Sequence, residues 1–180
     1  MMQPMIRICG GFLLVMLAGC ASPHSASTAP ASAVVADAEP QVAVLPPPSE
    51  PMECVPYARQ VSGIDLRGDA WTWWDKAKGR YERGKRPRRG AVLVFRKTGA
   101  LPRGHVSVVT AIIGAREILI THANWSSSDD ERGLVTSDVR VIDISPGNDW
   151  SEVRVWNGSD FGQHYPAAGF IYPVPTATGA

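Results

Sequence analysis

The pattern of apolar and polar positions changes character half-way along the chain. In the first half, two stretches carry apolar residues at helical spacing, which predicts helices over 54–62 and 70–78. Gly63 and Gly79 follow these stretches as stop signals, and Asp69 is placed to cap the second helix. In the second half, short apolar and β-branched runs between turn residues predict strands. These runs lie at 91–96, 105–113, 116–125, 139–144, 152–156 and 169–172.

Short strands that follow two helices predict an α+β domain with N-terminal helices packed on an antiparallel β-sheet. Trp71 and Trp74 share one helical face and are expected to pack in the core. The chain has 180 residues, which is room for one such domain and extensions. We expect the domain to span 52–174 and a flexible tail to occupy 175–180.

Residues 1–19 read as a targeting segment. Arg7 provides a positive start, and the apolar run at 8–17 is too short for a membrane span. The run ends in Leu17-Ala18-Gly19-Cys20, which resembles the bacterial lipobox, in which the cysteine is lipidated. We therefore expect a lipoprotein that contacts the membrane through a lipid on Cys20. It would lie in the cell envelope, at the periplasmic face of the outer membrane if the host is Gram-negative.

The stretch 20–51 is rich in Ala, Ser and Pro and has no periodic apolar face, which predicts a lipidated start followed by a disordered linker. The formal net charge of +1 gives no reason to expect a nucleic-acid partner. The stretch 76–89 departs from this near-neutral charge balance, because it carries eight basic residues and one acid, Glu82. This stretch is either a solvated loop or a contact for anionic lipid headgroups or acidic wall polymers.

Three cysteines occur in the chain, at positions 9, 20 and 54. The first would be lost with the signal peptide and the second would carry lipid, so Cys54 is left without a disulfide partner. An unpaired cysteine in an exported protein is a candidate reactive thiol. Its place at the start of a helix would favour the thiolate through the helix dipole. The alternative is a small buried apolar residue.

Three polar residues interrupt the predicted sheet. His105 begins a strand after Gly104, whose missing side chain would leave room beside the imidazole. His122 and Asn124 are two positions apart on the next strand, so their side chains are expected on one face. If the helix that begins at Cys54 packs over this face, a thiol, an imidazole and an orienting polar group meet. Cysteine nucleophilic catalysis needs that set of groups.

Four features together resemble the CHAP domain over residues 53–172. They are the cysteine at the helix start and the motifs Pro-Arg-Arg-Gly-Ala-Val-Leu-Val-Phe, Gly-His-Val-Ser-Val-Val and His-Ala-Asn-Trp. CHAP denotes a cysteine, histidine-dependent amidohydrolase/peptidase with a papain-like fold. The resemblance implies cleavage of amide bonds in peptidoglycan, by an endopeptidase or an amidase. We expect a monomer that needs neither a cofactor nor a metal.

The resemblance also implies roles. Cys54 matches the family nucleophile and His105 the family histidine. Many members have an acidic residue where this chain has His122, so His122 is favoured as orienting residue by alignment and Asn124 by chemistry. The backbone N–H of Cys54 is expected to help hold the oxyanion.

Other site chemistries have less support. A zinc site built from Cys54, His105, His122 and His164 lacks a His-Glu-x-x-His motif, and His164 is expected in a surface loop. A serine hydrolase has no support either, because the sequence contains no Gly-x-Ser-x-Gly elbow. The remaining alternative is a catalytically weak or inactive lipid-anchored module that binds the cell wall, because His122 stands where an acid is usual.

Overall fold

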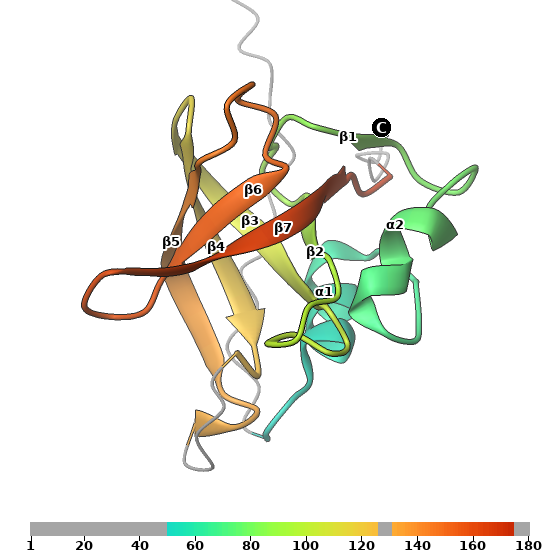
Figure 1. Ribbon diagram of the computed structural model, residues 1–180. Helices are drawn as coiled ribbons and strands as arrows, with labels where there is room; N and C mark the ends of the chain where they lie inside the picture. The colour runs from blue at the N-terminus through green and yellow to red at the C-terminus, as the bar shows by residue number, and fades with distance from the viewer. Residues whose placement is uncertain (1–49, 126–130, 175–180) are drawn as a thin grey trace, which may run out of the picture. The chain divides into compact units, whose positions relative to one another are not determined.

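The computed structural model describes residues 50–125 and 131–174, in which short helical segments precede an antiparallel sheet (Figure 1). The helical segments are α1 (Cys54–Ser62), the 3-10 turn η1 (Ala70–Thr72) and α2 (Trp73–Lys76). The strands are β1 (Arg83–Gly84), β2 (Val92–Phe95), β3 (His105–Gly114), β4 (Glu117–Ala123), β5 (Val135–Asp143), β6 (Glu152–Trp156) and β7 (Phe161–Ile171). The predicted signal peptide, the predicted lipidation site Cys20 and the predicted tail at 175–180 lie outside the described residues, as does the predicted linker up to residue 49.

The strands are ordered β1-β7-β2-β3-β4-β5-β6, and β6 also pairs with β7. Six strands therefore close into a barrel, and β1 is added outside it on β7. The predicted antiparallel sheet is confirmed, and helices precede it as expected. The α+β, papain-like description holds only in part, because the sheet closes on itself and the helices are few and short. Closure leaves no free edge along these six strands.

Barrel closure depends on the length of β7, which begins at Phe161 rather than at the predicted residue 169. Its first half pairs with β6 and its second half with β2. Gly162 and Pro166 made the first half look like a loop. Pro166 cannot donate a hydrogen bond within the sheet, but its carbonyl accepts one from Arg96 N, at 2.9 Å.

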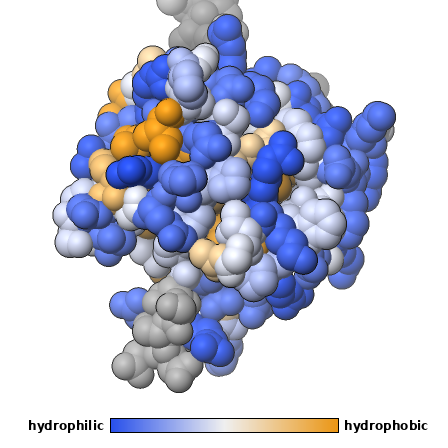
Figure 2. All heavy atoms as spheres, viewed as in Figure 1, coloured by the Kyte–Doolittle hydropathy of each residue, from blue (hydrophilic) through white to orange (hydrophobic). Residues whose placement is uncertain are grey.

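Strand β2 separates two hydrophobic cores, and all four of its residues are buried. Leu93 and Phe95 point into the barrel, whereas Val92 and Val94 point toward the helices. We call the two groups the barrel core and the helix-side core. The barrel core includes Leu93, Phe95, Val109, Ile120, Val141 and Phe170. The helix-side core includes Ala58, Ile64, Trp73, Val92, Val106 and Val108. The surface in Figure 2 is mainly hydrophilic, as expected for two enclosed cores.

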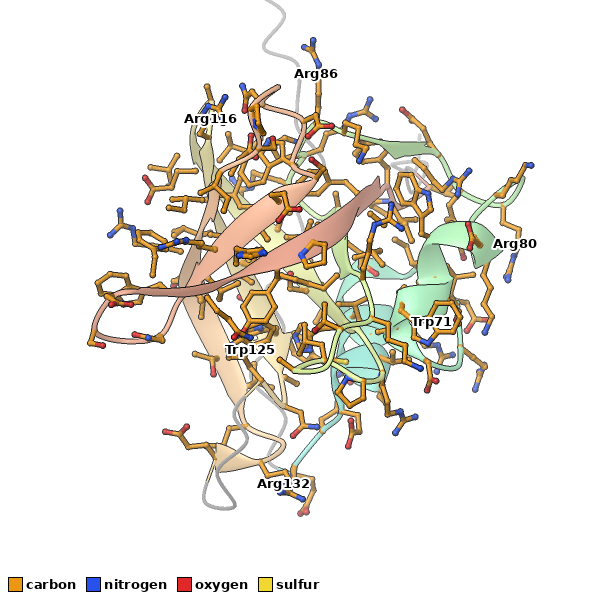
Figure 3. All side chains as sticks on the ribbon, viewed as in Figure 1. Trp71, Arg80, Arg86, Arg116, Trp125 and Arg132 are labelled. Carbon is orange, nitrogen blue, oxygen red and sulfur yellow. The ribbon has the colours of Figure 1, made fainter. Side chains whose placement is uncertain are left out.

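The second helical segment differs from its prediction. It begins as a 3-10 turn, its α-helical part ends at Lys76, and Trp73 rather than Trp71 or Trp74 is the fully buried tryptophan. Trp71 is 41% exposed and lies on the helical part of the molecule (Figure 3). The side chain of Asp69 makes no cap hydrogen bond, because it pairs with Arg103 instead.

Helix α1 agrees with its prediction at both ends. Gly63 follows it with a φ of 71°, a left-handed conformation that glycine adopts without a Cβ clash, and its N–H bonds to Arg59 O. Among the described residues, no helix is long and apolar enough to cross a membrane.

Candidate active site

Cys54 is the first residue of α1, and the extended Glu53 precedes it as N-cap. Pro56 fits the first turn because the N–H that it lacks has no helical partner there. The chain before the helix is held in place, since Met52 N donates to Gly133 O at 2.9 Å. Cys54 is partly buried and packs against the helix-side core. Local helix signals and one backbone bond therefore position the thiol.

Burial raises the pKa of the Cys54 thiol above its ordinary value, and the neighbouring negative charge of Glu53 adds to this. The backbone N–H groups of Val106, Val55 and Cys54 itself lower the pKa, but desolvation outweighs them. The backbone N–H groups at the helix start therefore favour the thiolate as expected, but burial opposes this effect and is the larger of the two. The thiol is neutral, and it lies against the backbone of Val106, the residue after His105.

His105 and His122 form a buried pair on neighbouring strands, with 3.2 Å between His105 Nε2 and His122 Nδ1. Their exposed fractions are 3% and 1%. Burial lowers the pKa of His105 well below its ordinary value, and the charge of His122 lowers it further. Burial also lowers the pKa of His122, to about 4. Both imidazoles are therefore neutral at pH 7, and the second nitrogen of His105, Nδ1, is left for chemistry.

Aromatic rings hold this histidine pair in place. Trp125 stacks on His122, with ring centroids 5.1 Å apart, and meets His105 edge to face at 4.8 Å. Phe95 contacts His105 from the barrel core at 5.7 Å. Figure 3 shows Trp125 near the end of β4, and it lines the same pocket as the start of α1. From the sequence, Trp125 could line the cleft, but packing in the core or against the sheet was favoured; the structure places it both in the pocket lining and against the histidine pair.

Asn124 does not share the position of His122. Its φ of 57° ends the extended conformation after Ala123, so the strand alternation that predicted a common face no longer applies. Its Nδ2 donates to Glu53 Oε2 at 3.0 Å, and its Oδ1 accepts from Gly133 N at 2.9 Å. Asn124 thus connects the end of β4 to the start of α1, and the hydrogen-bond partner of His105 is His122.

Cys54 and His105 line one pocket of about 450 Å³. The start of α1, the turn before η1, the β2–β3 loop and the end of β4 form its walls. Helix α1 packs with Val106 and Val108, on the helix side of β3. Val109 faces the barrel core, and strand alternation places His105 on the same side as Val109. The thiol and the imidazole therefore approach from opposite faces of β3, and both line the pocket at its first residues. No hydrogen bond joins Cys54 Sγ to the His105 ring.

The pocket geometry corrects the expectation for Gly104. The space left by its missing side chain is filled by the helical segment, because a Cβ there would lie 2.6 Å from Trp71 N. Gly104 has a φ of 66°, so glycine is also required by the backbone conformation. The glycine allows η1 to approach the strand that carries His105.

Within residues 50–125 and 131–174, no group of three or more His, Cys, Asp or Glu side chains is arranged to hold a metal ion. His164 lies on β7, not in a loop as predicted. Its side chain is 66% exposed and its Nε2 is 3.9 Å from Glu152 Oε2. The zinc site of the sequence analysis would need His164 at the pocket, but His164 is not among the residues that line this pocket.

Comparison with known families supports the kind of domain that the sequence motifs predict. Residues 47–124 match the CHAP domain family. This part of the chain is similar to CHAP domains. The matched range contains Cys54, His105, His122 and Asn124, and CHAP domains are in general amidases or peptidases, so the match supports a hydrolase. No curated protein matches the chain.

Proposed function

We propose that this protein is a cysteine hydrolase of the cell envelope that cleaves amide bonds of peptidoglycan, as an endopeptidase or an amidase. Cys54 is the nucleophile, His105 is its base and His122 positions the base. The observation that carries the proposal is that Cys54 and His105 line one pocket while His105 Nε2 is hydrogen-bonded to His122 Nδ1 at 3.2 Å. A thiol, a base and a group that orients the base are the parts that cysteine catalysis requires.

The histidine pair specifies the tautomers that the reaction needs. His105 must have a free Nδ1 to accept the thiol proton, so its own proton is on Nε2. His105 Nε2–H then donates to His122 Nδ1, which places the proton of His122 on its Nε2. A neutral imidazole supports the His105 imidazolium less than a carboxylate would, because it brings no negative charge.

The reaction begins with two neutral partners. As a substrate amide enters the pocket, the Cys54 proton passes to His105 Nδ1 and the sulfur attacks the carbonyl carbon. Backbone N–H groups at the start of α1, including that of Cys54, stabilise the oxyanion. His105 returns the proton to the leaving amine, and water then hydrolyses the thioester. The separation of thiol and ring at rest is compatible with this order, since catalytic hydrogen bonds often tighten only when substrate binds.

A different class of function, a wall-binding module with weak or no catalysis, remains the alternative. Three observations favour it: the raised pKa of Cys54, the lack of a hydrogen bond between Cys54 and His105, and His122 in the place of an acid. Both proposals share the same surface pocket. They differ in whether covalent chemistry occurs at Cys54.

Alkylation of the full chain in detergent, read at Cys54 by peptide mass spectrometry, separates the two functions. Wild type, His105→Ala and the exposed control His164→Ala are titrated from pH 5 to 10, and peptidoglycan digests are assayed for new amines. The hydrolase predicts amine release that stops in His105→Ala and continues in His164→Ala. Binding to peptidoglycan without amine release by the folded wild type would establish the wall-binding module.

The proposed location rests on residues outside the structure. We propose that the protein acts as a monomer at the membrane, anchored by lipid on Cys20, at the periplasmic face of an outer membrane where the cell has one. Metabolic labelling with a fatty acid should mark the wild type and Cys9→Ser but not Cys20→Ser. Label retained by Cys20→Ser would rule out this anchor.

A further inference from the structure

The rim of the catalytic pocket carries three charged side chains. Glu53 precedes α1, Asp69 precedes η1, and Arg103 lies in the β2–β3 loop. Arg103 is the only lysine or arginine among the described residues that line this pocket. The rim therefore offers one positive position, with a carboxylate on each of the other two elements.

Arg103 uses one side of its guanidinium for a hydrogen bond to Asp69. Its Nε donates to Asp69 Oδ1 at 2.9 Å, and its side chain is 74% exposed. The structure shows no partner for the two terminal nitrogens within the described residues. Arginine binds carboxylates most specifically through two parallel N–H bonds, and the Asp69 contact uses a single one. The terminal N–H groups are thus available to a second carboxylate.

The backbone holds Arg103 in place before any ligand arrives. Trp71 N donates to Arg103 O at 3.2 Å, and Gly104 N donates to Leu101 O at 2.9 Å. Gly104 packs against Trp71 so closely that a Cβ would clash. The contact with Asp69 fixes the side chain from the opposite element. Such support is what a specific binding group needs, because little ordering is left to occur on binding.

Arg103 is also electrostatically close to the nucleophile. The hydrogen bond and charge of Asp69 are the main cause of the raised pKa of Arg103, and the charge of Glu53 and that of a Cys54 thiolate, when one forms, raise it further. Because Arg103 and Cys54 line one pocket, a group bound at the guanidinium would lie in the same pocket as the reacting sulfur. Glu53 and Asp69 would repel an anion placed beside them, so the positive position for an anionic group is the side of the Arg103 guanidinium that faces away from Asp69.

We propose that Arg103 is a specificity residue that binds a free carboxylate of the substrate beside the scissile amide. The inference rests on the proposed hydrolase function and narrows its substrate class. Peptides with a free carboxylate near the cleaved bond are preferred over the same peptides with a carboxamide at that position.

The test uses the full chain in detergent and two synthetic peptides. The peptides contain the amide bond identified in the peptidoglycan digest and differ only in a carboxylate or a carboxamide beside it. We expect wild type to favour the carboxylate peptide about tenfold in kcat/KM, the size of one exposed charge-assisted contact. Arg103→Gln should bring this ratio near one, and Arg103→Lys, which keeps the charge without the planar fork, should give an intermediate ratio.

Arg67→Gln is the matched control, because Arg67 has a side chain 75% exposed, has a neighbouring aspartate and does not line the pocket. It should keep the wild-type ratio. A ratio near one in wild type, or a full ratio in Arg103→Gln and Arg103→Lys, would overturn the role of Arg103 and leave the hydrolase standing. Failure of folded wild type to cleave either peptide or peptidoglycan would overturn both.

Discussion

The thiol and the imidazole of the proposed site come from two regions that are built differently. His105 and His122 belong to neighbouring barrel strands and sit among aromatic rings, at most 3% exposed. Cys54 begins a nine-residue helix that packs on the outer face of β3 and is only partly buried. The barrel therefore determines the protonation and orientation of the base, whereas the docking of a helix end determines where the nucleophile lies.

This difference separates two kinds of perturbation. Substitutions in the barrel should change the pKa values of the two histidines and the pH dependence that follows from them. Changes on the helical side should act on the distance between sulfur and imidazole. The following substitutions test this division, from the largest expected effect to the smallest.

Cys54→Ser should reduce peptidoglycan cleavage by at least about 10³-fold, because the hydroxyl is a far weaker nucleophile at the same place. The helix start tolerates serine, so thermal unfolding should change little. Amine release from peptidoglycan measures the loss, and Cys9→Ser, which lies outside the domain, should behave as wild type. Activity retained in Cys54→Ser would exclude Cys54 as nucleophile.

Trp73→Ala should destabilise the domain by about 3–5 kcal/mol, because it empties the centre of the helix-side core. Trp71→Ala removes a tryptophan that is 41% exposed and should cost less than about 1 kcal/mol. Urea unfolding compares the two variants. Equal losses would show that the helix-side core is not centred on Trp73.

Acid should destabilise the protein through its buried histidines. The folded-state pKa of His122 is about 4 against an ordinary 6.5, so the unfolded chain binds more protons between these values. The stabilisation is complete above about pH 6.5 and is lost as the pH falls toward 4, by about 3 kcal/mol for His122 alone. His105 acts in the same direction.

Urea unfolding at a series of pH values measures this dependence. His122→Asn, which does not titrate, should flatten the curve between pH 6.5 and 4. The exposed control His164→Asn should leave it unchanged. An unaltered slope in His122→Asn would mean that other groups cause the acid sensitivity.

The hydrogen bond between Asn124 and Glu53 links the two regions, and its removal should have the smallest effect. A double-mutant cycle of Asn124→Ala and Glu53→Ala should give a coupling free energy of about 1 kcal/mol in unfolding experiments. We expect kcat to fall in Asn124→Ala because the start of α1 is then less firmly held. Coupling near zero would indicate that Met52 and Gly133 alone hold this end of the helix.

Local patterns were sufficient for much of the secondary structure. Helix α1 was predicted to the residue, because its stop signal and apolar spacing are local. Strand β6 was also predicted to the residue, since its alternation is bounded by turns. Strand β7 was predicted too short, because Gly162 and Pro166 resemble loop residues unless the partners on β2 and β6 are known. Barrel closure depends on those pairings between distant strands, so it could not be predicted from short stretches of the sequence.

The candidate residues followed from residue type and motif. One cysteine at a helix start and a histidine at a strand start identified Cys54 and His105 before any geometry was known. The choice between His122 and Asn124 needed the backbone, because a positive φ at Asn124 turns its side chain to Glu53. Arg103 carried no sequence signal and stands out only from its place on the pocket rim.

The sequence by itself determined the elements, the reactive residue types and the similarity to CHAP domains, since these depend on residue identity and short-range spacing. Only the tertiary structure decided that the sheet closes into a barrel, that His122 is the partner of His105, and that thiol and imidazole are neutral at rest. The physical reason is that pairing between distant strands and removal of water from an ionisable group depend on what the whole fold places around each residue.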